Sequence, residues 1–379
     1  MENKLSKTDF DILDSLRGLA ALYVMIAHCR GILWMGGKVF LEKNPMANWS
    51  FYDYFVFSSS LLTRLAVEFV ILFFVLSGFS IAYSLRNKGA NKLFYLKRFI
   101  RIYPPYLIAL VWAGIVFLIT KAMNPEFYKI EYDSLAFLRY IQMNDFFSPL
   151  VILKNLIYLP MEGFITPFWS LSFEVIFYLI APFLMYKRRI YYFSSVILFV
   201  IGIIFEKQII NFNLPHLLKE FIFNYNFFFM IGIFLFWNYD KIVELFKNIN
   251  KKVFLFIIFL FLGLTYLINI YIQVETKYSF LSASIFTVLL IVYFLKYSVK
   301  IKFLQIIGKF SYTLYITHVA TIFLLHSIYF KVLKLTPPHI ENFWLFIPGI
   351  LFSLIVAYVF YLIVEKKSKN LLEKFRKRN

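Results

Sequence analysis

Ten long apolar stretches, separated by polar segments, limit the fold of this 379-residue chain more than any other feature. A helix that crosses a bilayer needs about 20 predominantly apolar residues, because each residue adds only about 1.5 Å of length. The stretches lie at approximately 13–35, 61–85, 99–121, 168–186, 190–206, 222–238, 253–272, 279–296, 308–331 and 343–364. The sequence therefore predicts an all-α, polytopic bundle of about ten transmembrane helices.

The composition excludes the main alternatives to a membrane protein. Hydrophobic residues make up 61% of the chain and charged residues 16%, whereas average soluble domains are about 45–50% apolar and about 25% charged. This apolar content is too high for a disordered chain. A disulfide-stapled fold is excluded because Cys29 is the single cysteine.

The distribution of basic residues predicts the orientation. With ten spans both termini lie on one side, and Lys and Arg are more than twice as frequent at the termini and even-numbered connections as at the odd-numbered ones. The positive-inside rule then places both termini in the cytoplasm. Clusters at 187–189 and 366–378 are interpreted as topology anchors that touch membrane lipids. The net charge of +19 is thus explained without a nucleic-acid partner, and we expect none.

The domain prediction follows from the lengths of the connections. Only the stretch at about 122–167 is long, and it is expected on the outer face. It carries Glu126, Glu131, Asp133, Asp145 and Glu162. The chain is therefore predicted to be a single membrane-embedded domain over 1–379, with a basic cytoplasmic tail at about 365–379. Its chemistry must be sought among ionisable residues inside the helices, because these are costly in lipid.

The first apolar stretch contains two such residues, Arg17 and His28. Eleven residues at about 100° each bring them to the same helix face, about 16 Å apart along the axis. One elongated substrate could contact both. Spacing leaves the alternatives open that Arg17 reaches the cytoplasmic interface and that His28 is a hydrogen-bonded core histidine.

The fourth stretch adds Glu174 at a depth comparable to that of His28. A carboxylate bonded to an imidazole would fix its tautomer and favour its protonated form, as a general base requires. Alternatively, Glu174 pairs with Arg30, Arg64 or a serine.

Two further segments carry polar groups at helical spacing. Arg98 and Arg101 share a face at the cytoplasmic border, where guanidinium groups suit phosphate recognition or contact with lipid. A late stretch presents Ser311, Tyr315 and His318 on one face. His326 and Glu68 are additional buried candidates for which the sequence indicates no partner.

Five segments, taken in chain order, resemble the motifs of a known protein family. They are Leu13-Asp14-Ser15-Leu16-Arg17-Gly18 with His28, Phe73-Phe74-Val75-Leu76-Ser77-Gly78-Phe79, the run Arg98, Arg101, Tyr103 and Pro104, Trp169-Ser170-Leu171-Ser172-Phe173-Glu174 with Tyr178 and Pro182, and Ser311-Tyr312 through His318. The family is the acyltransferase-3 family of bacterial integral-membrane acyltransferases. The chain departs from the family pattern at two places. The family tends to place an acidic residue directly before the paired phenylalanines, whereas Glu68 lies five positions before Phe73. The family often has a proline soon after a glutamate that ends the last helix, whereas Glu365 is followed by Lys366.

The resemblance implies transfer of an acyl group, most often acetyl from acetyl-CoA, to a hydroxyl of an envelope polysaccharide or lipid-linked sugar. The expected location is the bacterial cytoplasmic membrane. His28 is expected to remove the hydroxyl proton or to carry the acyl group itself, with Glu174 and Arg17 as the other catalytic residues.

Binding residues are also implied by the resemblance. Donor phosphates are expected at Arg98, Arg101 and Tyr103. Substrate or oxyanion contacts are expected at Trp169, Ser172, Ser77, Tyr312 and His318.

Two other classes of function compete with this prediction. Intramembrane Arg, Glu and His also line transport paths, so an exporter of polysaccharide or lipid-linked sugar is the main alternative. A scaffold acting through the basic tail is the third. No metal site is predicted, because His28, His216, His318, His326 and His339 lack ligand-like spacing. The sequence predicts neither the acceptor, nor the acyl group, nor the oligomeric state.

Overall fold

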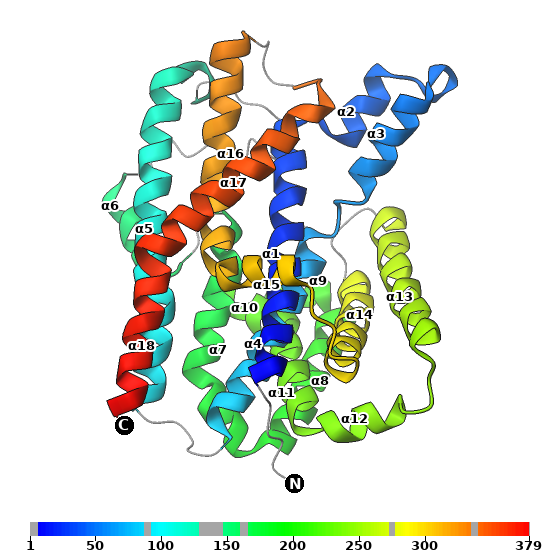
Figure 1. Ribbon diagram of the computed structural model, residues 1–379, viewed down its shortest axis with the longest axis vertical. Helices are drawn as coiled ribbons and strands as arrows, with labels where there is room; N and C mark the ends of the chain where they lie inside the picture. The colour runs from blue at the N-terminus through cyan, green and yellow to red at the C-terminus, as the bar shows by residue number, and fades with distance from the viewer. Residues whose placement is uncertain are drawn as a thin grey trace. The chain divides into compact units, whose positions relative to one another are not determined.

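The computed structural model describes residues 7–86, 92–128, 147–159, 166–272, 277–334 and 340–378, which form helices with no strand among them (Figure 1). Within these ranges, nine helical segments are long and apolar enough to cross a membrane. The predicted span at 190–206 is not among these nine; it corresponds to α8 (Arg188–Ile204), a helix of 17 residues. The chain is a polytopic helical membrane protein, as the apolar pattern predicted.

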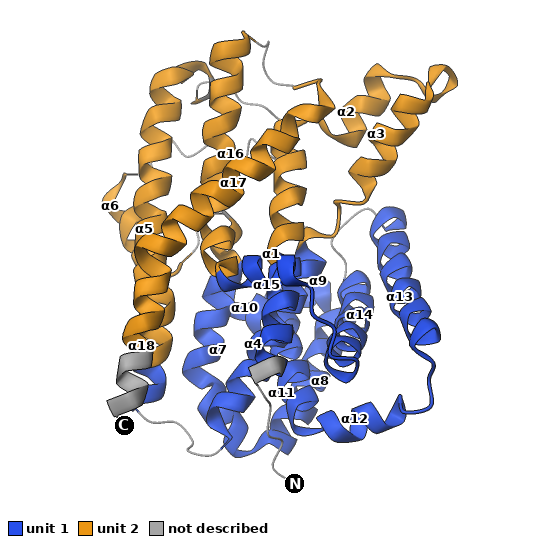
Figure 2. Ribbon diagram, in the orientation of Figure 1, with its two compact units in different colours: residues 1–20, 67–96, 170–309 blue, residues 21–66, 97–169, 310–379 orange. Residues whose placement is uncertain are grey.

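The chain forms two compact units, each assembled from separate segments (Figure 2). Unit 1 comprises residues 1–20, 67–96 and 170–309. Its helices are the first part of α1 (Lys7–Leu33), nearly all of α4 (Ala66–Leu85) and α7 (Trp169–Tyr186), then α8, α9 (Glu206–Ile210), α10 (His216–Glu220), α11 (Asn226–Trp237), α12 (Tyr239–Leu245), α13 (Lys251–Tyr271), α14 (Lys277–Lys296) and α15 (Lys302–Lys309). The prediction of a single domain over 1–379 stays a prediction.

Glycines bring the backbones of unit 1 into close contact, as two helix crossings show. A Cβ on Gly232 of α11 would overlap the carbonyl oxygen of Val75 on α4. At the second crossing, a Cβ on Gly308 of α15 would overlap the carbonyl oxygen of Asp14 on α1. Small residues that allow such close approach are typical of helix packing in membranes.

The α1–α15 crossing gives the first testable prediction. Gly308→Ala should lower the midpoint of thermal unfolding in detergent, because overpacking against backbone costs about 1–3 kcal/mol. Gly263→Ala on α13 is the control, since nothing lies within 4 Å of a Cβ added there. Equal midpoints for the two variants would contradict the packing described.

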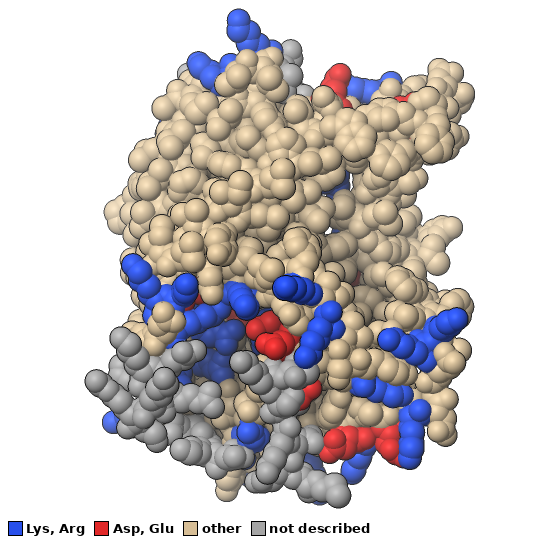
Figure 3. All heavy atoms as spheres, viewed as in Figure 1, with Lys and Arg blue, Asp and Glu red and all other residues tan. Residues whose placement is uncertain are grey.

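Unit 2 comprises residues 21–66, 97–169 and 310–379. Its helices are the rest of α1, α2 (Gly36–Lys43), α3 (Phe51–Leu61), nearly all of α5 (Lys92–Met123), α6 (Pro149–Leu156), α16 (Ser311–Leu333), α17 (Phe346–Phe360) and α18 (Lys366–Arg378). In Figure 3 the surface over α5, α16 and α17 is largely uncharged, with Lys and Arg gathered toward the helix ends, as expected of spanning segments. The predicted orientation of the termini stays a prediction.

Hydrogen bonds fix the register of α5 against α16. At the start of α16, Tyr312 donates to the carbonyl oxygen of Ile102, in the first half of α5, at 3.0 Å. Just beyond the end of α5, Asn124 donates to the carbonyl oxygen of Ser327 at 2.9 Å. Because the partners advance together along both segments, α5 and α16 run parallel.

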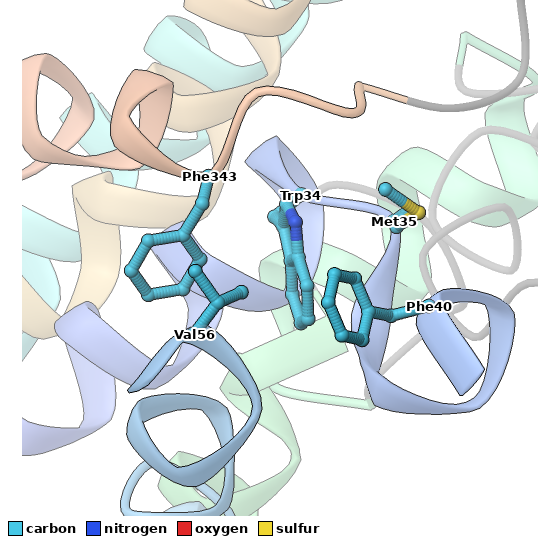
Figure 4. Packing of buried hydrophobic residues seen from close by; sticks show 5 residues of the cluster. All are labelled: Trp34, Met35, Phe40, Val56 and Phe343. Atoms are coloured by element: carbon cyan, nitrogen blue, oxygen red, sulfur yellow. The ribbon is translucent and has the colours of Figure 1, made fainter. Parts of the chain in front are cut away.

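The connection between the first two spans contains α2 and α3, which the sequence analysis did not predict. A cluster of Trp34, Met35, Phe40, Val56 and Phe343 packs these helices against the end of α1 and the turn before α17 (Figure 4). The available signal was Ser50, which caps α3 and exchanges hydrogen bonds with Asp53.

The acidic connection at about 122–167 is described in part. Glu126 lies in a short turn (Pro125–Tyr128) that follows α5. Glu131, Asp133, Asp145 and Glu162 lie outside the described residues.

Candidate active site

Two histidines of unit 2 form the centre of the candidate site. His28 on α1 and His318 on α16 lie with Nδ1 of His28 3.1 Å from Nε2 of His318, and their ring centroids are 5.0 Å apart. His28 is half-buried, whereas His318 is fully buried. Both residues were candidates from the sequence, in which no feature paired them.

Backbone carbonyls determine which nitrogen of each ring carries the proton. Nδ1 of His28 lies 2.9 Å from the carbonyl oxygen of Val24, and Nδ1 of His318 lies 3.0 Å from that of Leu314. A carbonyl only accepts, so we assign the proton to Nδ1 in both neutral rings. Each Nε2 then carries a lone pair.

The start of α5 supplies basic side chains to the same unit. Arg98 and Arg101 are half-buried, and Arg101 immediately precedes Ile102, the residue whose carbonyl binds Tyr312. Six residues separate Tyr312 from His318 on α16, a rise of about 9 Å. Ile102 and the histidine pair are therefore less than two helical turns apart along α16, and Arg98 lies about one further turn back along α5.

Tyr103 and Tyr312, both expected to bind ligands, use their hydroxyls within the protein. Tyr103 donates to the carbonyl oxygen of Leu156 on α6 at 3.3 Å, and Tyr312 donates to Ile102. Their roles toward substrate stay predictions.

Glu365, noted only as a departure from the family pattern, anchors the start of α16. It lies at the end of a π-helical turn (Tyr361–Glu365) and is 3% exposed. Its carboxylate accepts from the backbone N–H of Thr313 at 3.2 Å and from the Thr313 hydroxyl. Lys369 lies 2.7 Å from the other carboxylate oxygen. A carboxylate at a helix N-terminus is electrostatically favourable, and it holds the segment that carries His318.

In unit 1, Arg17 is oriented by two partners that the sequence did not indicate. Its guanidinium donates to Asp14 Oδ1 at 2.8 Å and to Ser80 Oγ at 2.5 Å. α1 continues unbroken from Lys7 to Leu33, so the helical spacing assumed between Arg17 and His28 is confirmed.

Glu174 bonds to a serine, which was one of the open alternatives. Ser77 on α4 donates to Glu174 Oε1 at 2.7 Å, and Tyr178 donates to the same oxygen. Ser77 and Glu174, selected separately from sequence, therefore belong to one cluster within unit 1. Arg30, another suggested partner, instead donates to Thr63 Oγ1 at 2.8 Å in unit 2.

The other candidates lie in packed surroundings. At the start of α7, Trp169 is half-buried and Ser172 is 2% exposed. Glu68 accepts from Asn269 and Ser279, both at 3.0 Å. His326 lies beside the ring of Phe330, with centroids 4.7 Å apart.

Among the described residues, no group of three or more His, Cys, Asp or Glu side chains could hold a metal ion. His339 lies outside the described residues.

Comparison with known proteins identifies the family. The family model described as an acyltransferase domain matches residues 10–362. The chain belongs to the acyltransferase-3 family. The histidine pair, the basic turn of α5 and the Ser77–Glu174 cluster all lie within the matched range.

One curated relative supports the same assignment. The chain is 34% identical over 124 residues to "Acyltransferase MdmB" of Streptomyces mycarofaciens. The match covers 32% of this chain and 29% of that relative. No solved structure matches the chain.

Proposed function

We propose that this acyltransferase moves an acyl group, most simply acetyl, from acyl-CoA to a hydroxyl of an envelope polysaccharide or lipid-linked sugar in the bacterial cytoplasmic membrane. The observation that carries the proposal is the half-buried His28 ring, whose Nδ1 is held by Val24. Its Nε2 makes no hydrogen bond to the described residues. A lone pair in that position suits a general base.

The donor site is assigned to the basic turn of α5. Arg98 and Arg101 bind phosphate groups of CoA, because guanidinium forks match phosphate oxygens. With CoA held there, its extended arm follows α16 toward His28. The rise of about 9 Å between Tyr312 and His318 supports this reach.

His28 then removes the proton from the acceptor hydroxyl. The hydroxyl oxygen attacks the thioester carbonyl as its proton moves to Nε2 of His28. The carbon–sulfur bond breaks when the resulting tetrahedral intermediate collapses, and the CoA sulfur takes the proton from His28 as it leaves. Atoms and charges balance, and the ring returns to its starting tautomer.

The remaining candidates keep the roles that the family resemblance implied. Arg17, oriented by Asp14 and Ser80, positions a phosphate or the pantetheine arm of the donor. Glu174, held by Ser77 and Tyr178, stays a catalytic candidate. Trp169 and Ser172 stay candidates for contacts to the substrate or oxyanion.

Purified protein in detergent tests the proposal against the transporter alternative. With acetyl-CoA labelled in the acetyl group and isolated envelope glycan or lipid-linked sugar, label should move to the acceptor and CoA should be released. Detergent supports no gradient, so a transporter would show neither product. Sugar movement in sealed vesicles without acyl transfer would contradict the proposal.

A further inference from the structure

We infer that His318 is a positioning residue: through the hydrogen bond between its Nε2 and Nδ1 of His28, it orients the His28 ring and stabilises the ring when it takes a proton. The inference rests on the proposed function, because it assumes that His28 is the base. The resemblance implied that His318 contacts the substrate; in this inference His318 instead acts on the His28 ring.

The geometry gives His318 an acceptor and His28 a donor. Leu314 fixes the proton of His318 on Nδ1, so its Nε2 presents a lone pair to Nδ1 of His28 at 3.1 Å. The Nδ1–H of His28 is shared between this lone pair and the carbonyl oxygen of Val24 at 2.9 Å. Such a three-centre bond restricts rotation of the ring and keeps its Nε2 directed away from both acceptors.

Protonation of His28 strengthens the same bond. When Nε2 takes the hydroxyl proton, the ring becomes an imidazolium and its Nδ1–H becomes a charge-assisted donor. The facing lone pair of His318 then stabilises the positive charge, as a carboxylate does in a Ser-His-Asp triad. The Nδ1 proton stays on His28 and does not move to His318. Its loss would leave a lone pair on Nδ1 facing the carbonyl oxygen of Val24, and two lone pairs repel.

Burial separates the roles of the two rings. His318 is 0% exposed, and its Nδ1 and Nε2 are both used by protein groups. The Tyr315 ring packs beside it, with centroids 5.9 Å apart, and the Tyr315 hydroxyl donates to the carbonyl oxygen of Pro167 at 2.9 Å. His318 is therefore enclosed by protein, and its effect on the reaction passes through His28.

Three variants of α16 separate positioning from packing. His318→Leu fills similar space without an acceptor, whereas His318→Gln restores an acceptor oxygen near the position of Nε2. His326→Leu is the control, because His326 is a second buried histidine on α16, 2% exposed and eight residues beyond His318. Each protein is purified in detergent, its unfolding midpoint is measured, and acetyl transfer from acetyl-CoA to isolated envelope glycan is followed.

We expect kcat of His318→Leu to fall roughly 10- to 100-fold, the range for a lost hydrogen bond to a charged group, with KM for acetyl-CoA unchanged. His318→Gln should recover at least part of kcat. Wild-type kcat in His318→Leu, an effect confined to KM, or equal losses in all three variants would overturn the inference. Failure of the proposed function is recognised separately, because His28→Ala would then retain transfer.

Discussion

His28→Ala should reduce kcat for acyl transfer about 10²- to 10⁴-fold, the usual contribution of a positioned general base. The substitution removes the Nε2 lone pair, which is the group assigned to take the hydroxyl proton. Binding of CoA should change little, because the donor phosphates are assigned to Arg98 and Arg101. The measurement is transfer of labelled acetyl from acetyl-CoA by the purified variant, together with a CoA binding isotherm.

A matched control distinguishes loss of the base from a general loss of histidine. His216→Ala removes an imidazole whose side chain is 87% exposed, so this variant should transfer at the wild-type rate. His28→Ala should also unfold at a midpoint close to that of the wild-type protein. Wild-type transfer by folded His28→Ala would eliminate the proposed mechanism.

The spans were predictable because a bilayer imposes a local requirement on sequence. Length and apolarity decide whether a segment such as α13 or α14 can cross the membrane, and both are read directly along the chain. The missed α2–α3 segment differs, because both helices lie in the connection between the first two predicted spans and each is too short to cross a membrane. Its signal was a local capping pattern, Ser50 with Asp53, and not a long apolar run.

Contacts between helices were not predictable by the same means. Helical spacing tells which residues share a face of one helix, but it does not say which helix lies opposite that face. His28 and His318 are 290 positions apart, and no periodicity links them. For Glu174, the sequence left a histidine, an arginine or a serine open as partner; the structure selects the serine, Ser77, and adds Tyr178.

The double variant Arg98→Gln and Arg101→Gln removes two charge-assisted bonds to phosphate and should raise KM for acetyl-CoA by at least about 100-fold, with a smaller effect on kcat. Each charge-assisted bond to phosphate contributes about 1.5–3 kcal/mol, and 1.4 kcal/mol corresponds to a tenfold change in affinity. Affinity of the wild-type protein for CoA should fall as salt is added, and this dependence should be weaker in the variant.

Controls for this prediction separate phosphate recognition from loss of positive charge at the membrane surface. Arg189→Gln removes an exposed arginine from a connection predicted to lie on the same cytoplasmic side and should leave CoA binding unchanged. The double variant Arg98→Lys and Arg101→Lys retains the charge without the planar guanidinium fork, so its affinity for CoA should lie between those of the wild-type protein and the double glutamine variant. CoA binding isotherms that coincide for the wild-type protein and the double glutamine variant would remove the donor site from the start of α5. The imidazole of His28 would then need a donor that approaches it by another route.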